Sequence, residues 1–303
     1  MKILVTGGAG FIGSHIVDRY VGLGHRVVVV DNLATGFRKN LNKNAKFYKA
    51  DIRNLKLMEK IFKKEKPRIV NHHAAVSEVM KSIKDPSLTY QVNVLGTANI
   101  LLASAKSGVK KVIFISSGGA VYGEQKRVLL SEKSEPNPLS PYSVSKLVGE
   151  KFTGFYGRNY GFDYLILRYG NVYGPRQNPK GEAGVIAIFT DLMKKGLRPT
   201  IFGDGTKTRD YVYIDDIVKA NILGLKNGKN EILNLGVGQE ISDQKVFDVL
   251  ARALGFKKPP IYGNFRPGEV YRIALNCDQA EKILKWRPKT DFKRGIEKYL
   301  DSL

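Results

Sequence analysis

Short apolar runs alternate with amphipathic segments through the first two thirds of the chain. The runs at residues 2–6, 26–30 and 111–117 are rich in Val, Ile and Leu, as expected of buried strands. Between residues 89 and 106, apolar side chains instead recur at every third or fourth position, which is the period of a helix. The alternation predicts an α/β fold built on a doubly wound (Rossmann), mostly parallel sheet. Further strands are expected at residues 46–50, 68–71, 163–168 and 232–235.

The regular alternation ends near residue 170. Beyond it the loops grow longer, although the apolar run at 232–235 has the pattern of one last sheet strand. We therefore expect a smaller, discontinuous α/β lobe that binds the substrate. The predicted boundaries assign residues 1–170 and 211–238 to the sheet domain and residues 171–210 and 239–303 to the lobe.

Composition restricts the class of protein. The 303 residues, 43% of them hydrophobic, suffice for a large core. No apolar run approaches the roughly 18 residues of a membrane span, and a strand pattern follows Met1 directly, so we expect a cytoplasmic protein without membrane contacts. Cys277 is the only cysteine, which excludes an intrachain disulfide and a cysteine zinc site.

The formal net charge of +22 suits an anionic ligand. The lysines are scattered through predicted helices and turns, with neither a basic arm nor a nucleic-acid-binding motif. This distribution favours a solvated surface that helps to attract a phosphorylated substrate over a surface that binds nucleic acid.

A glycine-rich turn follows the first strand, with glycines at every third position, Gly7, Gly10 and Gly13. Such a turn at the start of a helix lets backbone N–H groups approach a pyrophosphate. The spacing differs from the standard dinucleotide fingerprint, but the second strand leads into Asp31, about 20 residues further on, where a carboxylate can bond an adenosine ribose. Because its charge would repel a 2′-phosphate, Asp31 indicates NAD rather than NADP.

Tyr142 and Lys146 stand four residues apart, just after Pro141, which suits the first position of a helix. One helical turn separates them, so the phenol and the ammonium share a face. We expect the cation to lower the pKa of the phenol toward neutrality, where it can exchange a proton with a hydroxyl. Taken alone, the pair is more typical of a solvated helix face.

Polar residues at the carboxyl ends of two predicted strands are further candidates, because doubly wound folds bind ligands at that edge. Ser116 and Ser117 end the strand at 111–117 and can bond a substrate alcohol. His72 and His73 follow another strand, but adjacent strand residues point to opposite faces and no nearby carboxylate completes a metal site. We therefore expect no metal.

Assembled, these motifs resemble those of the extended short-chain dehydrogenase/reductase family, and within it the UDP-glucose 4-epimerases and their nucleotide-sugar relatives. The similarity covers nearly the full length. The segments that carry it are 6–15, 31–32, 51–53, 122–123, the Tyr142/Lys146 pair, 167–176, 209–211 and 266–269. The resemblance implies an NAD-dependent isomerase that inverts C4 of a UDP-hexose, interconverting UDP-glucose and UDP-galactose.

The resemblance also implies the site residues. The catalytic residues would be Tyr142 and Lys146, with Ser117 as the expected hydroxyl. The cofactor positions are Gly7, Gly10, Phe11, Ile12, Gly13, Asp31, Asn32, Leu33, Thr35, Gly36, Asp51, Ile52, His73, Ala74, Ala75, Val76, Ser77, Asn93, Ser117, Tyr142, Lys146 and Gly170. The substrate positions are Ser117, Tyr142, Asn171, Val185, Thr200, Ile201, Phe202, Arg209, Arg266 and Glu269.

The implied reaction proceeds through a transient 4-keto sugar, with NAD bound throughout. Tyr142 would take the proton of the sugar 4-hydroxyl, and the hydride that leaves C4 would return to the opposite face after the sugar turns over. The resemblance further implies a homodimer that pairs through the helices at 89–106 and 142–158.

The chain departs from the family at one position. Counted back from Tyr122, the usual catalytic Ser or Thr is Gly118 here. Our hypothesis is that Ser117 supplies the hydroxyl or that Tyr142 contacts the sugar directly. The same segment lacks the Asp-Glu pair with which 4,6-dehydratases of the family eliminate water.

Two questions about the substrate stay open. A UDP-glucuronate decarboxylase or epimerase, or another NAD-dependent nucleotide-sugar enzyme of the family, would need the same initial oxidation. Ile273 matches the position of the family's size gate and is smaller than tyrosine, which would suit N-acetylhexosamines.

Overall fold

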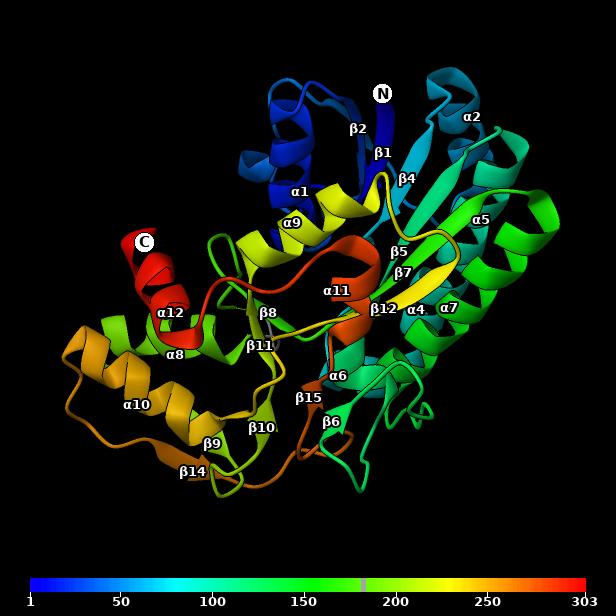
Figure 1. Ribbon diagram of the computed structural model, residues 1–303. Coiled ribbons are helices and arrows are strands. Elements are labelled where there is room, and N and C mark those ends of the chain that lie inside the picture. The colour runs from blue at the N-terminus through cyan, green and yellow to red at the C-terminus, as the bar shows by residue number, and fades with distance from the viewer. Residues whose placement is uncertain (181–183) are drawn as a thin grey trace.

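The computed structural model describes residues 1–180 and 184–303. Its centre is a seven-stranded parallel sheet with the order β12-β7-β5-β4-β1-β2-β3. The strands wind outward in both directions from the β1–β4 pair, which confirms the predicted doubly wound sheet (Figure 1). The strands are β1 (Lys2–Thr6), β2 (Arg26–Asp31), β3 (Lys46–Lys49), β4 (Ile69–His72), β5 (Lys111–Ser117), β7 (Asp163–Tyr169) and β12 (Glu231–Leu235).

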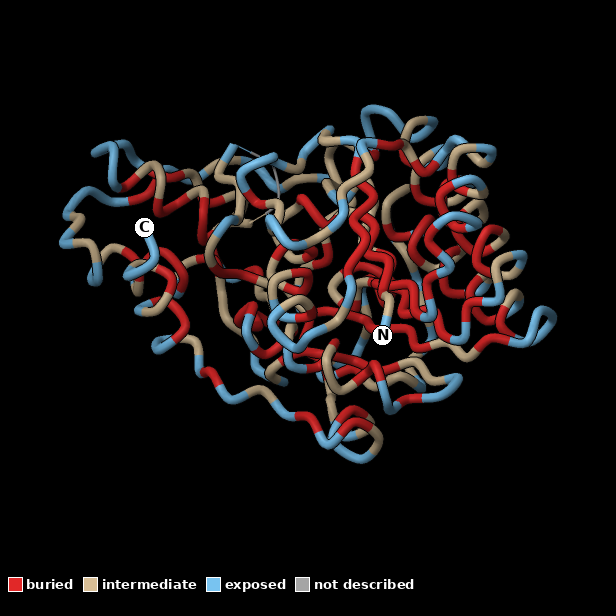
Figure 2. The backbone as a smooth tube through the Cα atoms, turned by 90° about the horizontal axis from the view of Figure 1, so that it is seen from above, coloured by how far each residue is buried: buried red, intermediate tan, exposed pale blue. Residues whose placement is uncertain are grey.

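Helices cover both faces of this sheet. One face carries α1 (Phe11–Gly22), α9 (Ile214–Gly224) and α11 (Asp278–Leu284). The other carries α2 (Leu55–Glu65), α5 (Thr97–Lys106) and α7 (Pro141–Tyr160). Neighbouring strand residues pack into opposite layers, so the strands are buried along most of their length (Figure 2). Of the described helices, the longest has 20 residues, and none is long and apolar enough to cross a membrane.

The helix expected at 89–106 differs from the prediction in its winding. The chain forms α4 (Pro86–Tyr90), then a π-helical segment (Gln91–Gly96), and only then α5. A π-turn contains one residue more than an α-turn, and such segments are frequent at functional sites. Apolar periodicity alone does not distinguish the two windings.

A smaller lobe packs beside the sheet domain. Its core gathers α8 (Val185–Lys194), α10 (Asp243–Leu254) and α12 (Phe292–Asp301). Three short strand pairs complete it: β8 (Asn171–Tyr173) with β11 (Tyr211–Tyr213), β9 (Thr200–Phe202) with β14 (Ile261–Gly263), and β10 (Thr208–Arg209) with β13 (Ile241–Ser242). β8 falls in the predicted lobe and β11 in the predicted sheet domain, so this strand pair crosses the predicted domain boundary. The exact domain boundaries stay a prediction.

The remaining elements are short. They are α3 (Val79–Lys84), α6 (Gly118–Val121), a 3₁₀ turn (Arg38–Asn40) and the pair of β6 (Leu129–Leu130) with β15 (Ala274–Leu275). The pair lies in one cluster with Val121, Tyr122 and Ile273, so the segment after β5 packs against the chain near residue 275.

Glu65, the last residue of α2, ties this helix to two strands. Its carboxylate accepts hydrogen bonds from Tyr48 (2.5 Å) and Lys2 (3.1 Å) and pairs with Lys46 at 2.6 Å. The Glu65 side chain is only 5% exposed. Burial raises the pKa of Glu65, but the hydrogen bonds from Lys46, Tyr48 and Lys2 outweigh it and lower the pKa from 4.5 to about 2.

We predict that Glu65→Gln lowers the free energy of unfolding by about 1–3 kcal/mol at pH 7. Because the folded pKa lies below the unfolded one, the carboxylate stabilises the fold fully above pH 4.5 and loses this contribution as the pH falls toward 2. Urea unfolding at pH 7, 5 and 3 should therefore show a difference between variant and wild type that shrinks with acid. The control is Glu59→Gln, which breaks an exposed pair with Lys106. Equal effects of the two variants at pH 7 would contradict the assignment.

Candidate active site

A cavity of about 670 Å³ lies at the carboxyl ends of the sheet strands and extends into the lobe. Its volume falls in the range of small-molecule sites. The sequence-predicted residues on its wall are Gly7, Gly10, Phe11, Ile12, Gly13, Asp31, Asn32, Thr35, Asp51, Ile52, His73, Ala74, Ala75, Val76, Ser77, Ser117, Tyr142, Lys146, Gly170, Asn171, Val185, Thr200, Ile201, Phe202, Arg209, Arg266 and Glu269. Leu33, Gly36, Asn93 and Ile273 do not line it.

The glycine turn is shaped for close approach to a ligand. Gly7 has a φ of +68°, and a Cβ on Gly13 would lie 2.3 Å from the Gly7 carbonyl oxygen. α1 begins directly after Gly10, without a side-chain cap. Its first N–H groups therefore face the cavity and suit the pyrophosphate of a dinucleotide.

Asp31 braces this turn from the end of β2. One carboxylate oxygen accepts from Ala9 N (3.0 Å) and the other from Leu33 N (2.8 Å). Leu33 thus supports the carboxylate instead of lining the cavity. Gly36 packs against the Ala9 backbone, where a Cβ would come within 3.0 Å. Both residues lie behind the wall that they shape.

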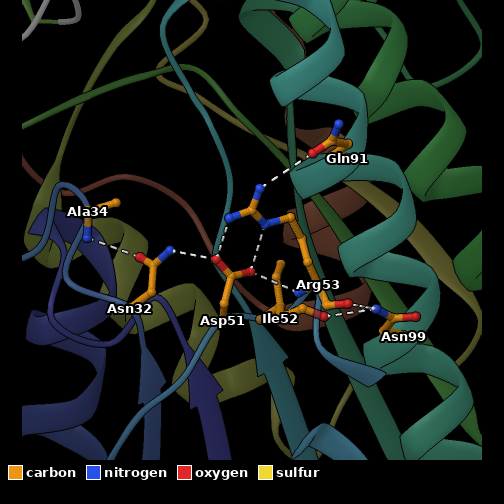
Figure 3. A network of polar contacts seen from close by, with 7 residues as sticks. All are labelled: Asn32, Ala34, Asp51, Ile52, Arg53, Gln91 and Asn99. Atoms are coloured by element: carbon orange, nitrogen blue, oxygen red, sulfur yellow. Dashed lines mark hydrogen bonds and ion pairs between the residues drawn. The ribbon is translucent and has the colours of Figure 1, made fainter. Parts of the chain in front are cut away.

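A polar network closes the wall at the ends of β2 and β3 (Figure 3). Asp51 accepts from Asn32 Nδ2 (3.1 Å), Arg53 Nε (3.0 Å) and Arg53 Nη2 (2.8 Å). The hydrogen bond from Arg53 is the main reason why the pKa of Asp51 falls to about 2. Arg53 also reaches Gln91 in the π-helical segment. Sequence reasoning missed Arg53 as a wall residue, although the resemblance included residue 53.

α7 carries the Tyr142/Lys146 pair into the cavity. Its first turn is fixed by Pro141 and by Ser140, whose hydroxyl accepts from Ser143 N. Lys146 Nζ donates to Ile115 O (2.7 Å) and lies 6.0 Å from the centroid of the Tyr142 ring. Both side chains are therefore held against the carboxyl end of β5.

The pKa of Tyr142 differs from the sequence-based expectation. Burial raises it to about 12, although a hydrogen bond with Ser117 lowers it. Burial likewise lowers the pKa of Lys146 to about 8, against the effect of the Glu150 charge. The four-residue spacing showed that the two side chains share a helical face. It did not show that both side chains are buried, and burial disfavours the charged form of each.

Ser117, and not residue 118, faces Tyr142. Ser117 ends β5 on the cavity wall, and its side chain is close enough to the phenol to lower the pKa of Tyr142. Gly118 is off the cavity wall, since a Cβ there would lie 2.6 Å from Leu275 Cδ1. Of the two alternatives left open by the sequence, the geometry favours the Ser117 hydroxyl. The signal in the sequence is that Ser117 is the last residue of the predicted strand at 111–117, whose carboxyl end faces the cavity.

Asn93 acts behind the wall. Its side chain accepts from Val76 N (2.7 Å) and donates to Val76 O (2.9 Å) and Ser145 Oγ (2.9 Å). It is 3% exposed. Asn93 thus joins the loop after β4 to the helix of Tyr142, as a ligand of the loop backbone.

The lobe contributes most of the charged groups at the other end of the cavity. The Arg266 guanidinium stacks 3.5 Å from the centroid of the Phe202 ring. Lys207, which sequence reasoning missed, pairs with both Glu269 and Asp243. Arg209 also lines this end. The three cations suit a diphosphate. Ile273, in contrast, is 1% exposed and packs among apolar side chains away from the cavity.

Asp210 holds the lobe and the sheet together. Its carboxylate accepts from Val237 N (2.7 Å), Gly238 N (2.9 Å) and Leu275 N (2.9 Å), and its carbonyl oxygen accepts from Asn171 N (2.6 Å). Burial raises the pKa of Asp210, and the three N–H groups lower it. The residue fixes four segments around the cavity.

Metal binding has no support in the described part of the chain. Among residues 1–180 and 184–303, no group of three or more His, Cys, Asp or Glu side chains is arranged to hold an ion. His72 is instead held between Thr6 and Thr97.

Comparison with known proteins agrees with this geometry. Residues 3–236 match the NAD dependent epimerase/dehydratase family. A UDP-glucose 4-epimerase from Mycolicibacterium smegmatis is 39% identical over 307 residues, covering 99% of this chain and 98% of that protein.

Two solved structures share the fold over their full length. The UDP-glucose 4-epimerase of Thermotoga maritima with UDP-glucose is 45% identical, with a TM-score of 0.98 and coverage of 100% of this chain and 98% of that one. The UDP-glucose 4-epimerase of Thermus thermophilus with NAD is 42% identical, with a TM-score of 0.95 and the same coverage of 100% and 98%.

We predict that Asn93→Ala loosens the loop after β4. The change leaves the Val76 N–H and C=O without partners, which should lower the free energy of unfolding by about 2–4 kcal/mol and speed hydrogen exchange at the Val76 amide. Asn99→Ala is the matched control. Asn99 lies on the same helical stretch as Asn93, and its side chain donates to the carbonyl oxygens of Ile52 and Arg53 without contacting Val76. Unchanged exchange at Val76 in Asn93→Ala would contradict the prediction.

Proposed function

The chain belongs to the NAD dependent epimerase/dehydratase family, and from this premise we propose that it inverts C4 of a UDP-hexose, interconverting UDP-glucose and UDP-galactose. The observation that carries the proposal is that Ser117, Tyr142 and Lys146 lie on the wall of one cavity, which the glycine turn and Arg266 also line. The family, together with the UDP-glucose and NAD in the solved relatives, gives this cavity its ligands.

NAD fits the sheet half of the cavity. The N–H groups at the start of α1 would hold its pyrophosphate, and Asp31 and Asp51 lie at the strand ends where the adenosine half would rest. The nicotinamide, when bound, supplies the oxidation and re-reduction of C4. The UDP half of the substrate would then occupy the lobe, with Arg209 and Arg266 on the diphosphate.

The chain's own residues move the proton. In the proposed reaction the sugar 4-hydroxyl gives its proton to the Ser117 oxygen while Ser117 passes its own proton to the Tyr142 phenolate, and the hydride of the broken C4–H bond would go to the nicotinamide. The resulting 4-keto sugar turns about its diphosphate linkage. The same groups return the proton when C4 is reduced from the other face, so protons and electrons balance over one turnover. Tyr142 enters this step as a phenolate. Burial opposes that form by raising the pKa of Tyr142 to about 12, and the proposal is that the Lys146 ammonium, one turn along α7, and the positive charge of NAD, when bound, would offset it.

The test is product analysis with UDP-galactose and UDP-glucuronate. The wild type should bring UDP-galactose and UDP-glucose to one equilibrium mixture. Tyr142→Phe should lower kcat about 10³-fold or more and Ser117→Ala about 10²-fold, because each removes a proton-transfer group, while bound NAD persists. The control is Tyr164→Phe, because Tyr164 lies at the amino end of β7 and the cavity lies at the carboxyl ends of the sheet strands.

Three outcomes would contradict parts of this reading. Turnover of UDP-glucuronate without turnover of UDP-galactose would make the protein a uronate-modifying enzyme of the same family. Full activity of Ser117→Ala would remove Ser117 from the mechanism. Unchanged kcat in Tyr142→Phe would remove the proposed proton transfer altogether.

We also propose a homodimer in the cytoplasm. The neighbouring α7 and the 86–96 stretch expose large apolar side chains, among them Leu95 (59% exposed), Phe155 (50%) and Val144 (37%). Val144 and Phe155 lie on one stripe of α7. A second copy of this chain would remove these side chains from water.

Light scattering should therefore give twice the chain mass of 33.8 kDa. Phe155→Glu should produce a monomer, because the charge would be buried in the interface. Leu23→Glu is the control, since Leu23 is 43% exposed just after α1, far from α7 in the fold. A wild type of 33.8 kDa in solution would contradict the dimer.

A further inference from the structure

A buried ion pair lies beneath the floor of the cavity. Glu150 stands two turns after Tyr142 on α7, and Arg168 extends from β7. Arg168 Nε and Nη2 donate to the two carboxylate oxygens at 2.9 and 2.6 Å. The side chains are 2% and 4% exposed. Neither residue lines the cavity.

Each member of the pair holds one further residue. Ser116 Oγ donates to Glu150 Oε1 at 2.5 Å. Arg168 Nη1 donates to the Tyr122 hydroxyl at 2.8 Å, and its guanidinium also lies over the Tyr122 ring at 4.8 Å. The Tyr122 hydroxyl in turn donates a hydrogen bond to Asn234 Oδ1 at 2.8 Å, so the hydroxyl both accepts and donates.

Ser116 and Tyr122 bracket the segment that contains the catalytic serine. Between them lie Ser117, whose hydroxyl meets Tyr142, and Gly119, where a Cβ would come within 3.1 Å of Asn171 Oδ1. One ion pair therefore anchors both ends of a seven-residue segment that contains two adjacent glycines, and glycine gives a backbone little stiffness of its own.

We propose that Glu150 and Arg168 are positioning residues for proton transfer: they clamp Ser116 and Tyr122 and thereby hold the Ser117 hydroxyl against Tyr142. The inference rests on the proposed function of Ser117. A buried ion pair gives a fold little net stability compared with apolar residues of the same volume. Its hydrogen bonds are directional, however, and here they run from helix α7 to Ser116 and from strand β7 to Tyr122.

The clamps can be released without breaking the ion pair. Ser116→Ala removes the bond to Glu150, and Tyr122→Phe removes the bonds to Arg168 and Asn234; both variants leave Glu150 and Arg168 bonded to each other. Because a displacement of about 1 Å costs up to about 10²-fold in rate, each variant should lower kcat about 10-fold or more, with the KM for UDP-galactose within about twofold of wild type. The isotope effect on kcat with UDP-galactose deuterated at C4 should rise.

A double-mutant cycle separates positioning from a general loss of structure. In a Ser117→Ala background, the hydroxyl to be positioned is gone, so Ser116→Ala and Tyr122→Phe should lower kcat no further. Ser104→Ala and Tyr20→Phe are matched controls, since both remove a buried hydroxyl with hydrogen bonds distant from the cavity. They should shift the melting temperature without changing kcat.

The outcomes distinguish this inference from the function on which it rests. A wild type without C4 epimerisation would overturn the proposed function itself. An active wild type whose Ser116→Ala and Tyr122→Phe variants keep full kcat would overturn only the clamp. Effects that multiply fully with Ser117→Ala would likewise overturn it, because the residues would then act independently of that hydroxyl.

Discussion

The buried carboxylate of Asp210 is the constraint on which the arrangement of the two parts of the molecule depends. It satisfies three backbone N–H groups, from the 236–238 turn and from β15, while its carbonyl oxygen takes the N–H of Asn171. A buried charge must find such partners, since leaving it unpaired is costly. Asp210 therefore fixes the sheet, the lobe and the 274–275 segment relative to one another. Its neighbours in the chain, Arg209 and Tyr211, both line the cavity.

The same junction explains how residues from distant parts of the sequence form one wall. Leu275 is fixed by Asp210, and its side chain fills the space that a side chain at residue 118 would need. Ser117 is therefore the only one of the pair Ser117–Gly118 that can present a hydroxyl to Tyr142. Leu275, 158 positions further along the chain, therefore determines which residue presents the hydroxyl as much as strand β5 does.

The sequence predicted the sheet well, because each strand of a doubly wound fold is a local apolar run and the order of such strands follows a known rule. It also placed the glycine turn, Asp31 and the Tyr142/Lys146 pair on one cavity. Prediction failed where the outcome depends on tertiary contact. The winding of residues 91–96, the raised pKa of Tyr142 and the place of Lys207 on the cavity wall depend on burial and on partners distant in the sequence, and no local pattern encodes them.

The π-helical segment has a consequence for how the chain tolerates changes in its length. One residue turns an α-helix by about 100°, so deleting a single residue from Gln91–Gly96 would restore an ordinary helix and rotate everything on one side of the deletion by that angle. Asn93 would leave Val76, or Asn99 would leave Ile52, since both cannot keep their partners. A single-residue insertion or deletion in this stretch would therefore cost the helix one of these two attachments.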